Sequence, residues 1–135
     1  MRKFFTNIIF FSLTYFLFIN FSHAEICKTE DSLVTIRSAA LDFYNEQNYR
    51  EAINCLAIGV KKNDFESQYK LGYLYSVGKG VAQDYKEAVR LFQLAVDQGS
   101  AYAQGQLGWY YANGNGVTQD YKEAVRLFQL AVDQG

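Results

Sequence analysis

The chain has 135 residues, of which half are hydrophobic, and this apolar content excludes an intrinsically disordered protein. Its 13 basic and 14 acidic residues leave a formal net charge of -1, so the chain lacks the positive charge with which proteins neutralise nucleic acid phosphates. This length gives room for one domain.

The N-terminus has the composition of an export signal. Arg2 and Lys3 precede a nearly unbroken apolar run over residues 4–21, which ends in the small-residue motif Ser-His-Ala. This order is typical of a secretory signal peptide, so we expect cleavage after Ala24 and a periplasmic or secreted protein. The alternative is an uncleaved inner-membrane anchor formed by residues 4–21, because such a run approaches the roughly 20 residues that span a bilayer.

Cleavage of residues 1–24 changes what the chain can do chemically. It leaves 11 basic and 14 acidic residues and removes His23, the single histidine in the sequence. A chain without histidine cannot form a Ser–His or Cys–His pair or a histidine-ligated metal site. We therefore expect no enzyme activity, no metal and no cofactor. The acidic balance excludes a nucleic acid partner, and removal of the apolar run leaves no membrane attachment after cleavage.

Two cysteines, Cys27 and Cys55, remain in the exported chain, and disulfides persist outside the cytosol. Cys55 falls on the apolar face of a predicted helix, where the later repeats carry Leu91 and Leu127. It is therefore either a small buried hydrophobic residue or the disulfide partner of Cys27. The segment before the first helix is long enough to fold back over the required two helical turns, about 10 Å.

One segment, QDYKEAVRLFQLAVDQG, occurs at residues 83–99 and again without a difference at residues 119–135, 36 positions later. Repetition at such a period predicts stacked structural units. Asn48, Asp84 and Asp120 share the same spacing of 36 and are each followed by Tyr, a basic residue and Glu. This pattern predicts three capping boxes, in which the first side chain accepts from free N–H groups of a helix and the Glu reaches back.

Apolar residues at helical spacing predict further helices over about 32–46, 65–77 and 101–113. Their expected caps are Asp31 or Ser32, then Asp64 and Ser100. Gly72 and Gly108 lie inside two of these helices and predict a close approach between neighbouring helices, with Ala40 as their equivalent in the first unit.

The last two units carry motifs of a known family. AQGQLGWYY, GNGV and DYKEA follow one another over residues 103–124, and the unit closes with Ala131 and Gly135. These motifs resemble the Sel-one-like repeat (SLR) family of tetratricopeptide-like solenoids, and the resemblance covers residues 64–135. It implies an all-α, right-handed α-solenoid of about three antiparallel helix pairs. The units are a tetratricopeptide-like repeat over 32–63 and Sel-one-like repeats over 64–99 and 100–135, after a leader over 25–31.

The resemblance also implies a function, which is that of an exported scaffold or adaptor for a protein or peptide partner. Some cysteine-rich relatives are described as β-lactamases, so a cysteine-containing hydrolase is an alternative. Those relatives have paired cysteines in every repeat, whereas residues 64–135 contain none.

In solenoids of this type the first helix of each pair lines a concave groove, and aromatic and Arg side chains are frequent hot spots of binding. We expect Tyr73 and Trp109, at equivalent positions, to be the exposed pair of this groove. The alternative is that these rings only pack between helices. The expected groove residues are Arg37, Tyr44, Asn45, Tyr69, Tyr73, Tyr102, Trp109 and Asn113, together with Leu41, Glu66 and Ser76.

The final helix repeats an internal sequence, although terminal repeats usually carry a polar outer face. We therefore expect Leu127, Leu130 and Ala131 to be poorly covered. Two hypotheses follow: the protein self-associates through this helix, or the sequence is a truncated fragment of a longer repeat protein.

Overall fold

The computed structural model describes Cys27 and residues 32–134, and the helical prediction is confirmed over this range. The predicted helices over 65–77 and 101–113 match the observed bounds, and the first helix is one residue shorter at each end than predicted. The predicted signal peptide and most of the leader lie outside the described residues. In the described part, no helix has the length and apolar character needed to cross a membrane. The helices are α2 (Leu33–Asn45), α3 (Tyr49–Lys61), α4 (Phe65–Val77), α5 (Tyr85–Val96), α6 (Ala101–Asn113) and α7 (Tyr121–Asp133).

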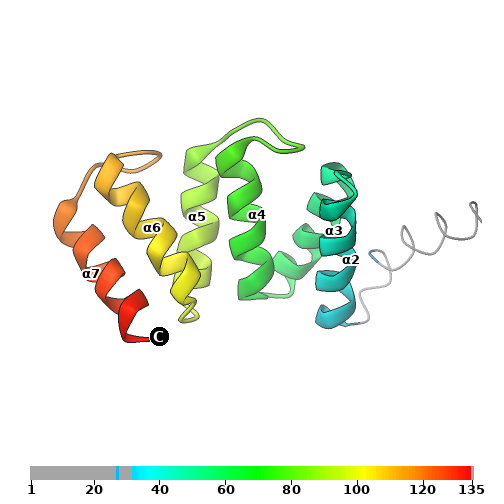
Figure 1. Cartoon of the computed structure of the whole chain (residues 1–135), viewed down its shortest axis with the longest axis horizontal. Helices are drawn as coiled ribbons and strands as arrows, with labels where there is room; N and C mark the ends of the chain where they lie inside the picture. The colour runs from blue at the N-terminus through cyan, green and yellow to red at the C-terminus, as the bar shows by residue number, and fades with distance from the viewer. Residues whose placement is uncertain (1–26, 28–31, 135) are drawn as a thin grey trace, which may run out of the picture.

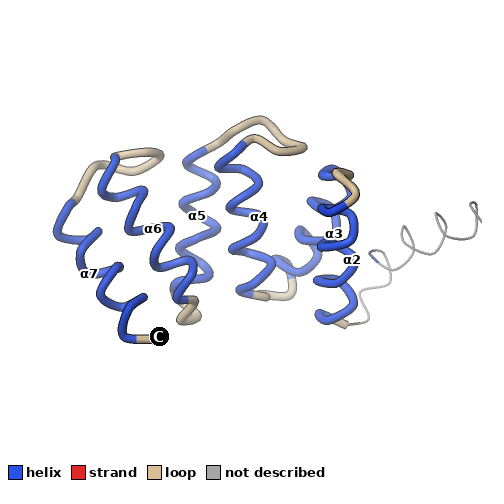
Figure 2. The backbone as a smooth tube through the Cα atoms, viewed as in Figure 1, coloured by secondary structure: helices blue, strands red, loops and turns tan. Residues whose placement is uncertain are grey.

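The helices form three antiparallel pairs, α2 with α3, α4 with α5 and α6 with α7, which follow one another in a row (Figure 1). The loops within the pairs all lie at one end of the helices, and the links between pairs lie at the other end (Figure 2). Each pair also packs against the next, through α3 with α4 and α5 with α6. This arrangement is an α-solenoid, as expected for repeats that cannot bury their apolar faces alone.

The aspartate caps of α5 and α7 are confirmed. The Asp84 carboxylate accepts hydrogen bonds from the amides of Lys86 and Glu87 at 2.9 and 3.1 Å. Asp120 does the same at the start of α7. Ser32, Asp64 and Ser100 also accept from amides in the first turns of their helices.

Other parts of the capping prediction are wrong. Asn48 makes no side-chain hydrogen bond at the start of α3. Glu87 does not complete the box, because both of its carboxylate oxygens accept from Arg90. The amide of Asp84 instead donates to the carbonyl of Tyr75, so the end of the preceding helix satisfies the group that Glu87 was expected to reach.

The close approach at Gly72 and Gly108 is confirmed. A Cβ atom on Gly72 would lie 3.0 Å from the ring of Phe92, and one on Gly108 would lie 3.0 Å from the ring of Phe128. The two helices of each later pair therefore come together over a glycine that leaves room for an aromatic ring. Both loops that follow these helices begin with a glycine, Gly78 or Gly114, at positive φ.

The outer face of α7 is exposed, although the prediction for Leu127 is wrong. Leu127 is fully buried because it points into its own helix pair, as does Leu91 in α5. Leu130 is exposed and Ala131 is partly exposed. The larger uncovered apolar stripe consists of Tyr121, Val125, Phe128 and Val132.

Candidate functional site

Equivalent positions on α2, α4 and α6 can be read from the helix bounds, because α4 begins 32 residues after α2 and α6 begins 36 residues after α4. Leu41, Tyr73 and Trp109 are equivalent on this basis. All three side chains are exposed, Tyr73 by 37% and Trp109 by 47%. The first helices of the three pairs therefore present a row of large apolar side chains to solvent.

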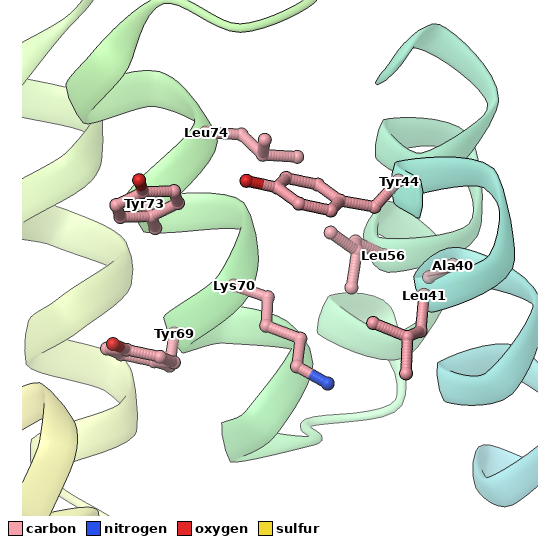
Figure 3. A pocket seen from close by; sticks show the side chains of 8 residues that line it. All are labelled: Ala40, Leu41, Tyr44, Leu56, Tyr69, Lys70, Tyr73 and Leu74. Carbon is pink, nitrogen blue, oxygen red and sulfur yellow. The ribbon is translucent and has the colours of Figure 1, made fainter. Parts of the chain in front are cut away.

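A pocket lies between α2 and α4, and we call it the α2–α4 pocket. Figure 3 shows Leu41 and Tyr44 of α2 on one side and Tyr69, Lys70 and Tyr73 of α4 on the other. Its volume is about 230 Å³, larger than the roughly 150 Å³ of an engineered apolar cavity that holds benzene. It can therefore hold one bulky apolar side chain. The lining is completed by Ala40, Leu56 and Leu74.

A second pocket lies between α4 and α6, and we call it the α4–α6 pocket. Tyr73 forms part of its wall, as it does in the α2–α4 pocket, and Trp109 of α6 faces it. Polar side chains line this pocket more richly than the other. The remaining lining residues are Ser76, Val77, Gln83, Tyr85, Gly105, Gln106, Tyr110 and Phe128.

The structure brings together part of the predicted groove. Tyr44, Tyr69 and Tyr73 line one pocket, and Tyr73 and Trp109 line the other. Tyr102 lies outside both pockets, with its ring 6.0 Å from that of Tyr69.

Four further predicted groove residues, Arg37, Asn45, Glu66 and Asn113, lie apart from the pocket walls. Asn45 and Asn113 are exposed, and the Asn113 amide donates to the carbonyl of Trp109 in its own helix. Arg37 lies beside the α2–α4 pocket and binds Glu66. The binding role of the whole set remains a prediction.

The junction between α2 and α4 is ionic. Arg37 and Lys70 both bind the Glu66 carboxylate, and hydrogen bonds from Lys70 and then Arg37 hold the pKa of Glu66 below its ordinary value. Arg37 also lies 3.9 Å from the buried carboxylate of Asp64, which caps α4. At the next junction the equivalent pair is Tyr69 with Tyr102, so ring contact replaces the ion pair.

Lys79 links the loop after α4 to the rings beside the α2–α4 pocket. Its ammonium donates to the Tyr44 hydroxyl at 3.3 Å and lies 5.3 and 5.4 Å from the ring centroids of Tyr44 and Tyr49. The hydrogen bond to Tyr44 is the main cause that raises the pKa of Lys79. These contacts add a positive charge near the mouth of the pocket.

Two buried glutamines help to close the later two helix pairs, one in each, and the sequence analysis did not find them. Gln68 accepts from Gln98 at 2.7 Å, and Gln104 accepts from Gln134 at 2.9 Å, so the same bond recurs in both units. The signal was available, because Gln recurs at both positions of each unit with a separation of 30. Lys70 and Gln106, which line the pockets, were also missed.

Two observations on the described residues concern groups that could take part in catalysis. The described residues contain no cluster of three or more His, Cys, Asp or Glu side chains that could hold a metal ion. Cys27 and Cys55 form a disulfide with their Cα atoms 5.1 Å apart. Because both cysteines of the sequence are in this bond, neither provides a thiolate nucleophile.

Comparison with known proteins places these features in context. The family model described as Sel1 repeat matches residues 65–100 and 101–135. A comparison with curated protein sequences gave no significant match.

Three solved structures are similar to the chain. A protective antigen of uropathogenic Escherichia coli strains, with an SLR fold, is 31% identical with a TM-score of 0.72, over 75% of this chain and 22% of that one. A Sel1 repeat protein from Oxalobacter formigenes is 30% identical with a TM-score of 0.67, over 70% of this chain and 39% of that one. Cysteine rich protein B of Helicobacter pylori is 23% identical with a TM-score of 0.66, over 84% of both chains. The chain thus spans less than half the length of the first two.

Proposed function

Because the chain belongs to the Sel1 repeat family, whose repeats generally mediate contacts between proteins, we propose that it is a scaffold that binds a peptide segment of a partner protein. The peptide lies across α2, α4 and α6. The observation that carries this proposal is the pair of adjacent pockets on these helices, which share Tyr73 as a wall. Exposed Tyr and Trp side chains supply large contact area together with a polar group, as binding hot spots do.

The test is selection of binders from a phage-displayed library of random dodecapeptides. We expect selected peptides to bind saturably and to change the fluorescence of Trp109, the single tryptophan of the chain. Replacing Tyr73 or Trp109 by alanine should weaken binding about tenfold or more, as at other interface hot spots.

The matched control is Tyr121→Ala, which removes an exposed tyrosine on α7 outside both pockets. It should leave peptide affinity unchanged. If no peptide binds, or if all three alanine variants weaken binding equally, the pockets are not the binding surface.

Export is part of the same proposal. The disulfide between Cys27 and Cys55 suits an oxidising compartment. The apolar N-terminal run has the order of a signal peptide. One similar structure is that of a protective antigen, which also fits a protein that leaves the cytosol.

A second candidate function is self-association through α7. The helices α5 and α7 have the same sequence, yet α5 packs closely between α4 and α6, whereas α6 is the one described helix that packs closely against α7. Val132 is therefore 72% exposed, whereas the equivalent Val96 packs against the core. The exposed stripe of Tyr121, Val125, Phe128 and Val132 has the 4-3-4 spacing of a helix-packing seam.

The partner that this stripe fits best is the same stripe on a second copy, in a two-fold symmetric contact. Head-to-tail stacking is disfavoured because α2 has a polar outer face. There, exposed Thr35 and Asp42 occupy the positions of buried Ala103 and Tyr110 in α6. The second copy therefore presents its own α7.

Sedimentation velocity tests this contact. We expect the unaltered chain to form a dimer at high micromolar concentration and the variant Val125→Glu/Val132→Glu to remain monomeric, because each copy would bury two carboxylates against those of the other. The control Gln129→Glu adds charge to α7 beside the stripe and should still dimerise. A monomer at every concentration of the unaltered chain would disprove the contact.

A further inference from the structure

The two pockets occupy the same place in successive units. One unit further along the chain, Tyr73 occupies the position equivalent to Leu41, and Trp109 the position equivalent to Tyr73. In the same register Gln106 is equivalent to Lys70, and each of the two lines its own pocket. The surface therefore repeats one subsite per junction between units, and Tyr73 stands between the two subsites.

The chemistry of the two subsites differs. The α2–α4 pocket is apolar, and Lys70 is the one charged side chain among the described residues that line it. The three cations Arg37, Lys70 and Lys79 lie in or beside it against two carboxylates, those of Glu66 and Asp64, so positive charge prevails by one. This environment favours a bulky apolar side chain next to a carboxylate.

The α4–α6 pocket instead offers hydrogen-bonding groups. Gln106 is half-buried in its wall, and its side-chain amide has no hydrogen-bond partner within residues 32–134. The neighbouring amide of Gln83 is different, because it already donates to the carbonyl of Ser76. Gln106 can therefore donate to and accept from an uncharged polar side chain of a ligand.

The distance between the two subsites decides how many residues separate the two ligand side chains along a peptide. Side chains of α2 and α4 meet in the Arg37–Glu66 ion pair, and those of α4 and α6 meet in the Tyr69–Tyr102 ring contact. Neighbouring helices lie about 8 to 10 Å apart, so successive subsites are separated by about that distance. In polyproline II conformation three residues advance a chain by about 9 Å and complete one turn. Residues i and i+3 then point to the same side, so they match the spacing of the subsites. Aromatic-lined grooves also suit this conformation, which loses little entropy on binding.

We infer that the two pockets read an extended peptide of polyproline II type at two positions three residues apart. A bulky apolar side chain enters the α2–α4 pocket, with a carboxylate beside it that meets Lys70. An uncharged hydrogen-bonding side chain meets Gln106 in the α4–α6 pocket. This inference rests on the proposed peptide-binding function and specifies its ligand.

The test uses a set of synthetic peptides with free ends blocked, derived from Pro-Asp-Leu-Pro-Pro-Gln-Pro-Pro. In the other members, Gln stands two, four or seven residues after Leu, or three residues before it to sample the opposite chain direction. In one of the two chain directions, we expect the peptide with Gln three residues from Leu to bind at least about fivefold more tightly than the peptides with a separation of two or four. A difference of this size corresponds to the loss of one side-chain contact. Affinity is measured from Trp109 fluorescence and by calorimetry.

Two protein variants test which peptide side chain binds in which pocket. Gln106→Ala should remove the preference for Gln over Ala at the second peptide position and leave the dependence on Leu unchanged. Lys70→Gln should remove the preference for Asp over Asn beside Leu and reduce the salt dependence of binding. Both side chains are partly exposed, and melting curves confirm that the variants are folded.

The outcomes separate this inference from the proposed function. If library peptides bind at Tyr73 and Trp109 but no spacing is preferred, the inference is wrong and the peptide-binding function stands. A preference for seven residues would show that the ligand is a helix, because seven helical residues also advance about 10 Å. If neither the library nor the designed set binds, both proposals fail.

Discussion

Replacing Phe92 by alanine is expected to lower the free energy of unfolding by about 3 to 5 kcal/mol, the usual cost of removing a buried aromatic ring. The Phe92 ring is fully buried, packs against Gly72, and lies 5.9 and 5.6 Å from the rings of Tyr69 and Tyr110. Its loss leaves a cavity at the junction of two units. Urea unfolding followed by far-UV circular dichroism measures the effect.

The chain contains its own control for this experiment, because Phe128 occupies the same position in a helix of identical sequence. Phe128 contacts Gly108 in its own pair but is 40% exposed, since no described element packs on its outer side. The variant Phe128→Ala should therefore lose only about 1 to 2 kcal/mol, the share expected for a partly buried ring. Equal losses at the two positions would show that burial between units contributes nothing.

Reduction of the disulfide should have the second largest effect on stability. The Cys27–Cys55 bond joins residues 28 positions apart and ties the segment before α2 to the buried face of α3. In the chain-entropy model, closing a loop of this length stabilises the folded state by about 3.6 kcal/mol. We expect a loss of that size when urea unfolding is repeated in the presence of a reductant.

A variant without the bond separates this effect from side effects of the reductant. Cys27→Ala/Cys55→Ala should be destabilised to about the same extent and should not respond to the reductant. Unchanged stability of the original chain after full reduction would contradict the prediction, and would mean that the folded units hold Cys27 in place without the bond.

The helices could be predicted from the sequence because apolar spacing and polar caps agree. Ser100 begins α6 and Asp84 begins α5 as predicted, since a short polar side chain before an apolar stripe can satisfy the first amides of a helix. Asn48 shows the limit of this argument. Its backbone enters α3 with φ of -84° and ψ of 65°, outside the extended conformation adopted by Asp84, and its side chain makes no capping bond.

Burial on α7 could be predicted only in part. The apolar stripe is visible in the sequence. Whether the Leu127 side chain points towards α6 or towards the outside, however, depends on how the two helices pack. The identity with α5 gave the better clue, because Leu91 and Leu127 are both fully buried within their pairs. The side chains that differ in exposure between the two helices are those that α5 turns towards α6.

The candidate site, too, could be predicted from the sequence only in part. The register of the repeats was sufficient to pair Tyr73 with Trp109, and both are exposed. It could not identify Lys70 and Gln106 as pocket walls, because each reads as a solvated polar residue on a helix. Their role comes from the space between two helices, which depends on how successive units stack.

The shared sequence of α5 and α7 makes the solenoid modular in an engineering sense. A copy of residues 99–134 placed behind α7 would meet there the same side chains that α6 already meets on α5. Such an insertion requires no new interface to be designed. Each added unit would also create one more pocket between first helices and would lengthen the readable ligand by about three residues, one turn of polyproline II.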